Sequence, residues 1–243
     1  MYIKVFTGDG CAKSLLVDET MTVGHVTRIL SDKNLVTPSP VWALVELSPE
    51  LHMERVYEDH ELLVDNCLLW KPDSKNTIWF MERPEKYDIF QRPQQYFPPS
   101  SLEMDCSRQE LFDKYFCNIG SGDHGGDTAP LEVTGHVWIK TQGKKSWTRN
   151  WCVLKPTGLF CSTKKSSDMV CLATFDVNQV YYGVDWRSEH RAPTQYCWAV
   201  KHPQVQVKNC KQIKYFCVET EMELHRWVTA IRLIKHGAQL CDN

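Results

Sequence analysis

The sequence predicts two domains of different architecture: an α+β domain built on one mixed sheet, and an all-β barrel closed by a C-terminal helix. The predicted elements of residues 1–90 follow the order ββαββαβ, whereas residues from 133 onward read as seven short strands and then one helix. Charge divides the chain in the same way, because residues 1–90 have a net charge of −6, residues 91–131 of −3 and residues 132–243 of +7. The near-neutral total therefore hides an acidic half and a basic half, and the basic half is suited to an anionic partner.

The first domain opens with a β-hairpin followed by a helix. Tyr2–Thr7 alternates apolar and polar residues, turns at a Gly-Asp-Gly sequence and continues as Lys13–Val17. Thr22 is a suitable N-cap for the helix that follows. The apolar face of this helix comprises Val23, Val26, Ile29 and Leu30. The helix is expected to end before the break at Pro38–Pro40.

A second hairpin and a short helix complete this domain. Trp42–Leu47 and Leu51–Val56 are predicted strands, and Asp59 is expected to cap a short helix that extends to Trp70. Thr77–Glu82 is the closing strand. One mixed sheet packed on a helix in this order is the ubiquitin-like roll.

Residues 87–130 are predicted to be a linker that is helical only in part. Three prolines begin it, a helix is expected near Arg108–Phe116, and the run Gly120–Gly126 is rich in glycine. No Lys-Ser or Lys-Thr pair follows these glycines, and the next element is a strand. The run is therefore interpreted as a flexible spacer and not as a phosphate-binding loop.

The second domain is predicted to contain seven strands and one long helix. The strands are Val133–Lys140, Trp147–Lys155, Gly158–Ser162, Val170–Asp176, Val180–Gly183, Tyr196–His202 and Ile213–Glu219. Thr220 and Glu223 form a capping box at the start of the helix, and Trp227 lies on its apolar stripe and is expected in the core. A helix that closes one end of a strongly bent sheet is the pleckstrin-homology arrangement.

Several function classes have no support in the sequence. No stretch reaches the roughly 18 apolar residues that a membrane span needs. Most of the eleven cysteines lie in strand patterns and are read as reduced core thiols. The sequence contains no Cys-x-x-Cys pair, no His-Glu-x-x-His motif and no nucleophile elbow. We therefore expect no enzymatic activity, no metal and no cofactor.

Nine short motifs, spread in order over almost the whole chain, identify a family. Taken together they resemble the lamellipodin family of actin-regulatory adaptors, and the growth-factor-receptor-bound adaptors are the alternative because they share the EDHE and GKKSW stretches. The motifs are MERVYEDHE (53–61), MERPEKY (81–87), GKKSW (143–147), GLFCSTK (158–164), YYG (181–183), APTQYC (192–197), KHPQ (201–204), IKYFC (213–217) and WVTAIRLIKHGAQL (227–240).

The resemblance implies a specific architecture and function. The fold is expected to be an α+β ubiquitin-like roll followed by an all-β pleckstrin-homology barrel capped by a C-terminal helix. Its parts are a Ras-association domain at 1–90, a linker at 91–131 and a pleckstrin-homology domain at 132–243. The implied function is a signalling adaptor that binds an activated Rap- or Ras-like small GTPase and membrane phosphoinositides, and links them to actin dynamics and cell migration. Such an adaptor is cytoplasmic and is recruited to the plasma membrane at the leading edge, and regions outside this fragment bind the actin-regulatory partners.

Four basic residues of the first domain are the candidates for GTPase binding. Lys13 and Lys33 match the basic positions of the family, and Lys4 and Arg28 are possible supporting residues. The expected route is strand addition, in which an edge strand pairs with the GTPase and nearby lysines meet its acidic residues. The alternative reading of each residue is an ordinary solvated side chain on a surface.

Five basic residues of the second domain are the candidates for phosphoinositide binding, namely Lys140, Lys144, Lys145, Arg149 and Lys164. Domains of this type that bind headgroups tightly have a basic-x-basic pair in their second strand, but Thr148 and Asn150 occupy these positions here. We therefore expect attraction by summed charge, with little selectivity between phosphoinositide isomers. The alternative is a basic face on a protein-binding module.

Overall fold

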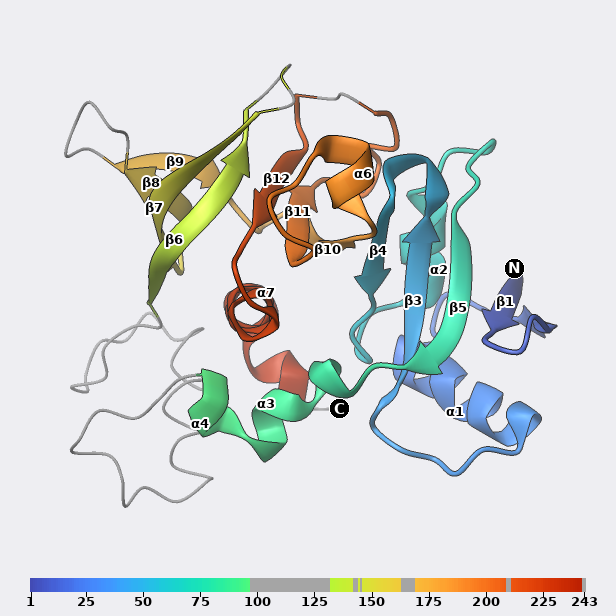
Figure 1. The fold of residues 1–243 in the computed structure, drawn as a ribbon. Coiled ribbons are helices and arrows are strands. Elements are labelled where there is room, and N and C mark those ends of the chain that lie inside the picture. The colour runs from blue at the N-terminus through green and yellow to red at the C-terminus, as the bar shows by residue number, and fades with distance from the viewer. Residues whose placement is uncertain (97–131, 142–143, 145, 163–168, 209–210, 242–243) are drawn as a thin grey trace.

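The computed structural model describes residues 1–96, 132–141, 144, 146–162, 169–208 and 211–241. The first domain follows the predicted order of elements (Figure 1). Its elements are β1 (Tyr2–Thr7), β2 (Ala12–Leu16), α1 (Val23–Asn34), β3 (Trp42–Ser48), β4 (Met53–Val56), α2 (Leu63–Leu68) and β5 (Thr77–Glu82). The strands are ordered β2-β1-β5-β3-β4, and only β1 and β5 run parallel. The buried side chains of Val5, Val26, Leu30 and Leu44 lie in the core of this domain, as the ubiquitin-like roll requires.

One of the two predicted helix caps in this domain is wrong. Thr22 caps α1, because its hydroxyl accepts a hydrogen bond from the backbone of the first turn at 3.2 Å. Asp59 does not cap α2, which begins only at Leu63 and has no side-chain cap. The Asp59 carboxylate instead accepts hydrogen bonds from the Lys86 ammonium and the Tyr87 hydroxyl. A charge-assisted bond to an ammonium is stronger than a bond to a neutral backbone N–H, and it involves residues that the local sequence pattern does not reveal.

The second domain is a barrel of seven strands in its described part. Its elements are β6 (Val133–Lys140), β7 (Trp147–Lys155), β8 (Gly158–Ser162), β9 (Met169–Ala173), β10 (Gln179–Gly183), α6 (Trp186–His190), β11 (Cys197–Lys201), β12 (Lys214–Cys217) and α7 (Glu221–His236). All seven predicted strands are present, although the ends of four are shifted. The short helix α6 is an addition that the sequence analysis did not predict. The all-β pleckstrin-homology barrel with a C-terminal helix is thereby confirmed.

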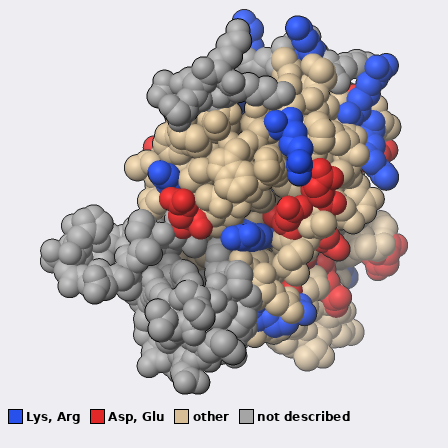
Figure 2. Space-filling model, turned by 60° about the vertical axis from the view of Figure 1, so that its left-hand side comes forward, with Lys and Arg blue, Asp and Glu red and all other residues tan. Residues whose placement is uncertain are grey.

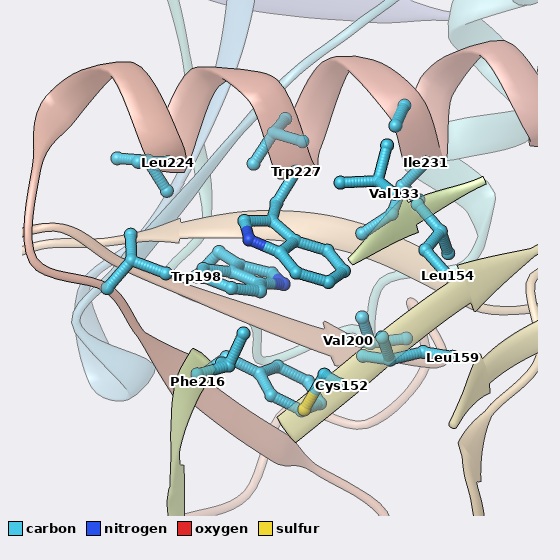
Figure 3. Close-up of a cluster of buried hydrophobic side chains, with 14 of the residues drawn as sticks. Val133, Cys152, Leu154, Leu159, Trp198, Val200, Phe216, Leu224, Trp227 and Ile231 are labelled. Carbon is cyan, nitrogen blue, oxygen red and sulfur yellow. The ribbon is translucent and has the colours of Figure 1, made fainter. Parts of the chain in front are cut away.

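Helix α7 closes the barrel with its apolar side chains (Figure 3). Trp227 is only 2% exposed and lies with its ring centroid 6.1 Å from that of Trp198, which stacks on Phe216. The predicted capping box is present, since Thr220 and Glu223 exchange side-chain to backbone hydrogen bonds. The structure therefore confirms that Trp227 is a core residue.

The described part of the linker packs against the second domain. Helices α3 (Asp88–Gln91) and α4 (Pro93–Tyr96) follow the first domain, and Ile89 and Tyr96 are buried in the barrel core. The helix predicted near Arg108–Phe116 and the glycine-rich run lie outside the described residues.

The two domains share one continuous sheet of twelve strands (Figure 1). Strand β4 of the first domain pairs antiparallel with β10 of the second, so that Met53 lies opposite Gly183. The carbonyl oxygen of His52 accepts hydrogen bonds from the backbone N–H of Val184 at 2.9 Å and from the indole N–H of Trp186 at 2.5 Å. We call this pairing of β4 with β10 the seam.

A buried ion pair also joins the two domains. The Arg232 guanidinium in α7 contacts both carboxylate oxygens of Glu58, at 2.6 and 3.0 Å, and donates a further bond to the carbonyl oxygen of Lys86 at 2.9 Å. Burial alone would raise the pKa of Glu58, but the nearby Arg232 outweighs it and lowers that pKa to about 2. The pair is therefore charged at neutral pH, and it fixes α7 against the first domain.

Candidate functional site

Strand β2 forms one edge of the twelve-stranded sheet. Within the described residues it pairs only with β1, which leaves its outer row of backbone groups available. An edge of this kind can accept an extended strand from another protein. The strand that carries Lys13 is therefore at an edge of the sheet, which is the position that strand addition needs.

The predicted GTPase-binding residues divide between different surfaces. Lys13 lies two residues before the buried Leu15 in β2, and side chains at this spacing share a face, so Lys13 is on the face that carries α1. Lys33 is exposed in the last turn of α1, one turn after Ile29, which packs on the core. Lys13 and Lys33 therefore lie on the same side of the sheet. Lys4 alternates with buried residues of β1 and lies on the opposite face.

The other two candidates are placed by neighbours that the sequence analysis did not foresee. The ammonium of Lys4 lies 5.0 Å from the ring centroid of Phe6. Arg28 is exposed on α1, but it lines a cavity between this helix and the segment that leads into β3, next to Trp42. Strand β3 is separated from β2 by β1 and β5. Arg28 thus belongs to a different surface from Lys13.

Lys140 and Arg149 share the outer face of the second barrel. Lys140 ends β6 with its ammonium 5.3 Å from the ring centroid of Tyr215. In the β6–β7 register Arg149 lies opposite Trp138, and Lys140 lies opposite Trp147. Lys140 and Arg149 are therefore diagonal neighbours on one face of the strand pair. Arg149 also lies 3.8 Å from the carboxylate of Glu219, which accepts a hydrogen bond from the Trp138 indole at 2.9 Å. Part of the charge of Arg149 is therefore balanced within the protein.

The two residues of β7 at the basic-x-basic positions, Thr148 and Asn150, face the other way. Thr148 and Asn150 alternate with Arg149, and therefore lie on the side of the strand that continues with the buried Cys152. The amide of Asn150 donates hydrogen bonds to the carbonyl oxygen and the hydroxyl of Thr148, at 3.0 and 3.1 Å. The structure thus places the cationic residues and the expected headgroup positions on opposite faces of β7.

Positive charge gathers at the β6–β7 end of the barrel. Lys144 is exposed in the connection between these strands, whereas the predicted Lys145 and Lys164 lie outside the described residues. Figure 2 shows most of the Lys and Arg side chains of one face in its upper half, which is the half that holds this end of the barrel in Figure 1. The arrangement is a spread of cations around one end of the domain.

Sequence reasoning missed one histidine and one lysine near the same barrel. His202 and Lys214 line a cavity of about 620 Å³ between the ends of β9, β11 and β12. Lys214 lies inside the IKYFC motif that supported the family resemblance, so a signal was present without a role attached to it. His190, although close to Lys140, adds no charge at neutral pH, because burial and then Lys140 lower its pKa to about 4.

The described part of the chain offers neither a metal site nor a membrane span. No group of three or more His, Cys, Asp or Glu residues in it is placed to hold a metal ion. None of its helices is both long and apolar enough to cross a bilayer. The buried Cys152, Cys161, Cys197 and Cys217 are free thiols.

Comparisons with known proteins agree with the two-domain architecture. A family model of the RA like domain matches residues 1–86, and one of the PH domain matches residues 131–236. The crystal structure of the coiled-coil, RA and PH domains of lamellipodin has a TM-score of 0.87 at 40% sequence identity, and the match covers 100% of this chain and 89% of that chain.

Curated relatives extend the same match to longer proteins. Ras-associated and pleckstrin homology domains-containing protein 1 of Homo sapiens is 41% identical, over 100% of this chain and 19% of its own length. Abnormal cell migration protein 10 of Caenorhabditis elegans is 36% identical, over 100% of this chain and 32% of its own length. This chain therefore spans only a part of these relatives.

The alternative group of adaptors matches at a lower level. Growth factor receptor-bound protein 14 of Bos taurus is 30% identical, over 99% of this chain and 44% of its own length. The two groups share the paired-domain unit, but the solved structure with 40% identity and nearly complete coverage of both chains is a lamellipodin. The chain belongs to the lamellipodin family of adaptors, in which a Ras-association domain is joined to a pleckstrin-homology domain.

Proposed function

We propose that this chain binds a GTP-loaded Rap- or Ras-like small GTPase at strand β2 and a phosphoinositide membrane at the β6–β7 end of the barrel. The observation that carries the GTPase half is the outer edge of β2, with which no other described strand pairs and which has Lys13 and Lys33 on one side of it. An effector strand of the GTPase adds to this edge through main-chain hydrogen bonds, and its acidic residues meet the two lysines.

The acidic net charge of the first domain does not oppose this interaction at the edge itself. Residues 1–33 contain four basic and four acidic residues, so the surplus of acid lies later in the domain. Opposite charges steer the encounter over a distance of about 8 Å in physiological salt. Local charge therefore permits the approach of an acidic effector surface.

The membrane half rests on spread charge. Lys140, Lys144 and Arg149 lie towards one end of the barrel. Lys145 follows Lys144 directly in the sequence, and Lys164 comes two residues after the end of β8. A basic residue near an anionic surface contributes about 1 kcal/mol of attraction. Several weak contacts of this kind hold the domain on a charged membrane without a tight headgroup pocket, and they respond more to lipid charge density than to phosphate position.

Binding both partners at once makes the chain a coincidence detector. The seam and the buried pair of Glu58 with Arg232 hold the two surfaces in one body, so a GTPase anchored in the membrane and the lipids around it raise each other's effective concentration. The chain is then a non-enzymatic adaptor that moves from the cytoplasm to the leading edge of the plasma membrane. Its link to actin dynamics and migration is supported by the name of one relative, abnormal cell migration protein 10.

A panel of GTP-loaded small GTPases, with and without phosphoinositide liposomes, tests the proposal. At least one Rap- or Ras-like member is expected to bind, and to bind more tightly on liposomes. Lys13→Glu places like charges across the interface and is expected to weaken this binding by at least tenfold, or about 1.4 kcal/mol. The matched control is Lys75→Glu, an exposed lysine that pairs with Glu50 outside the candidate surface. An unchanged affinity of the Lys13→Glu variant for every GTPase would refute the assignment of β2.

A further inference from the structure

A cavity beside α1 has the features of a binding site that the two proposed surfaces do not use. Its volume is about 620 Å³, within the usual range of ligand pockets. The helix forms one wall with Thr27 and Arg28, and the segment leading into β3 forms the other with Pro38, Pro40 and Trp42. We call this cavity the α1 groove.

The walls of the α1 groove are held in place by specific contacts. The backbone N–H of Gly24 donates to the carbonyl oxygen of Asp59 at 2.9 Å, and a Cβ atom at Gly24 would lie 3.0 Å from the Cβ of Asp59. On the opposite wall, the Trp42 indole donates to the carbonyl oxygen of Thr37 at 3.2 Å, and its ring stacks on Phe80 at 4.6 Å. The groove is therefore preformed, which lowers the entropic cost of binding a ligand.

A polar atom in the wall lacks a partner. Thr27 is only 7% exposed, and its hydroxyl makes no hydrogen bond to any described residue. The neighbouring hydroxyl of Ser31 is satisfied, because it donates to the carbonyl oxygen of Thr27 at 3.1 Å. His60 lines the groove too, and its buried Nδ1 atom likewise has no hydrogen-bond partner in the part of the chain that the structure describes. Buried polar atoms are nearly always paired, and a hydrogen-bonding group in the groove would supply the partner that the Thr27 hydroxyl lacks.

The charge of the groove favours an anion. Asp59 also lines the groove, but its carboxylate is bound by the Lys86 ammonium and the Tyr87 hydroxyl. Arg28 is exposed and makes no ion pair within the described residues. A single guanidinium offers two parallel N–H donors, which fit one carboxylate.

We propose that the α1 groove binds a short extended segment of a partner protein that carries a glutamate or aspartate. The carboxylate lies on Arg28, a backbone group of the segment bonds the hydroxyl of Thr27, and its apolar side chains cover Trp42 and the two prolines. A peptide fits better than a small phosphorylated ligand, because the groove offers one cation and an apolar wall instead of the several donors that a phosphate takes. This site is separate from the GTPase edge, since β1 and β5 lie between β2 and β3.

The test uses the whole chain and a displayed library of random heptapeptides. The selected peptides are expected to be enriched in Glu or Asp at one position flanked by apolar residues. Synthetic versions are then measured by fluorescence polarisation, each with a partner peptide in which Gln replaces the Glu. The Gln version is expected to bind about tenfold more weakly, a difference of about 1.4 kcal/mol. Arg28→Gln is expected to remove this difference, and the nearly isosteric Thr27→Val to weaken binding several-fold.

Lys13→Glu and Lys33→Gln are the matched controls, because both change a charge at the proposed GTPase surface and neither residue lines the groove. Neither is expected to alter peptide affinity, and the thermal midpoint confirms that each variant is folded. Selection without acidic enrichment, or an affinity unchanged by both Arg28→Gln and Thr27→Val, would overturn the proposal. If the two control variants change the peptide affinity instead, the peptide binds at the GTPase edge, and the groove is rejected as its site. Displacement of the peptide by micromolar inositol phosphate at the same residues would assign the groove to a small anion, and would equally reject the peptide.

Discussion

The ion pair of Glu58 and Arg232 is the single contact whose loss is expected to damage the protein most. Both side chains are almost fully buried, so loss of the carboxylate leaves the guanidinium charge unpaired in the protein interior. Glu58→Gln is therefore expected to lower the free energy of unfolding by about 3–5 kcal/mol, measured by urea denaturation. The control Glu50→Gln breaks an exposed pair with Lys75 and is expected to change stability by less than about 1 kcal/mol. Similar losses for the two variants would contradict this account.

We expect the protein to lose stability in mild acid because of His236, the last residue of α7. Burial lowers the pKa of His236 in the folded protein to about 4, against 6.5 for the unfolded chain. The unfolded state therefore binds the proton more tightly, and stability falls as the pH drops through the interval from 6.5 to 4. Between pH 7 and pH 5 the free energy of unfolding is expected to fall by about 2 kcal/mol from this group.

Substitution of the histidine isolates its part of the pH dependence. His236→Gln keeps a polar group next to His60, 3.1 Å away in the parent, and is expected to flatten the stability profile between pH 7 and pH 5. The control is His25→Gln, which replaces an exposed histidine. His190, whose pKa is also lowered to about 4, keeps a part of the slope in both variants. A profile that is equally steep in His236→Gln would exclude His236 as its source.

Residue positions within strands were predictable, but their neighbours were not. The alternation of Ile3, Lys4 and Val5 already indicates that Lys4 points away from the core, and hence away from the face of Lys13. The position of Arg28 on a groove was not predictable, because the opposite wall belongs to Pro38–Trp42, whose path back along the helix is set by tertiary packing. For the same reason the sequence could not show that Glu219 partly balances Arg149.

At the scale of elements, the connection between β6 and β7 is expected to govern membrane binding. Lys144 is exposed there, and Lys144→Glu removes one positive charge and adds one negative charge. At about 1 kcal/mol for the lysine alone, liposome binding is expected to fall at least fivefold, and the binding of the parent to weaken as salt rises. Liposome sedimentation measures both effects.

The control for this loop lies at the other end of the same strand. Lys155 ends β7 at its turn into β8 and lies 4.0 Å from Glu132, so Lys155→Glu makes the same change in charge away from the proposed membrane surface. Its liposome binding is expected to stay within about twofold of the parent, a difference of about 0.4 kcal/mol. Equal losses in the two variants would mean that net charge, and not the loop, sets the affinity.

The regular elements were predictable because they have strong local patterns. Strand periodicity placed all seven barrel strands, and the capping box of Thr220 with Glu223 fixed the start of α7. Helix α6 was not predictable, because Trp186–His190 is too short for a helical period to be visible. The pairing of β4 with β10 was equally hidden, since the alternation of a strand does not reveal which strand it pairs with.

For the molecule as a whole, the seam predicts that the two domains unfold together. Gly183 lies in the seam, where a Cβ atom would approach Trp186 to 2.6 Å and the Cβ of Cys197 to 2.8 Å. Gly183→Ala is therefore expected to lower stability by about 1–3 kcal/mol, in both domains at the same denaturant concentration. Hydrogen exchange followed by mass spectrometry reports each domain separately.

A glycine with free space around it supplies the comparison. A Cβ atom at Gly8 would have no atom within 4 Å, so Gly8→Ala is expected to leave the stability of both domains nearly unchanged. Separate midpoints for the two domains, in the parent or in Gly183→Ala, would show that the seam does not couple them.

The seam also determines where the chain can be divided. Separation of the two domains would uncover the edges of β4 and β10 together with the apolar side chains of Met53, Tyr181 and Trp186, which are fully or almost fully buried. Unpaired strand edges beside apolar surface favour self-association. Each domain produced alone would therefore expose a strand edge that is prone to aggregation. When the two domains are mixed, β4 and β10 can pair again. A cut between the domains therefore makes two complementary fragments of one protein.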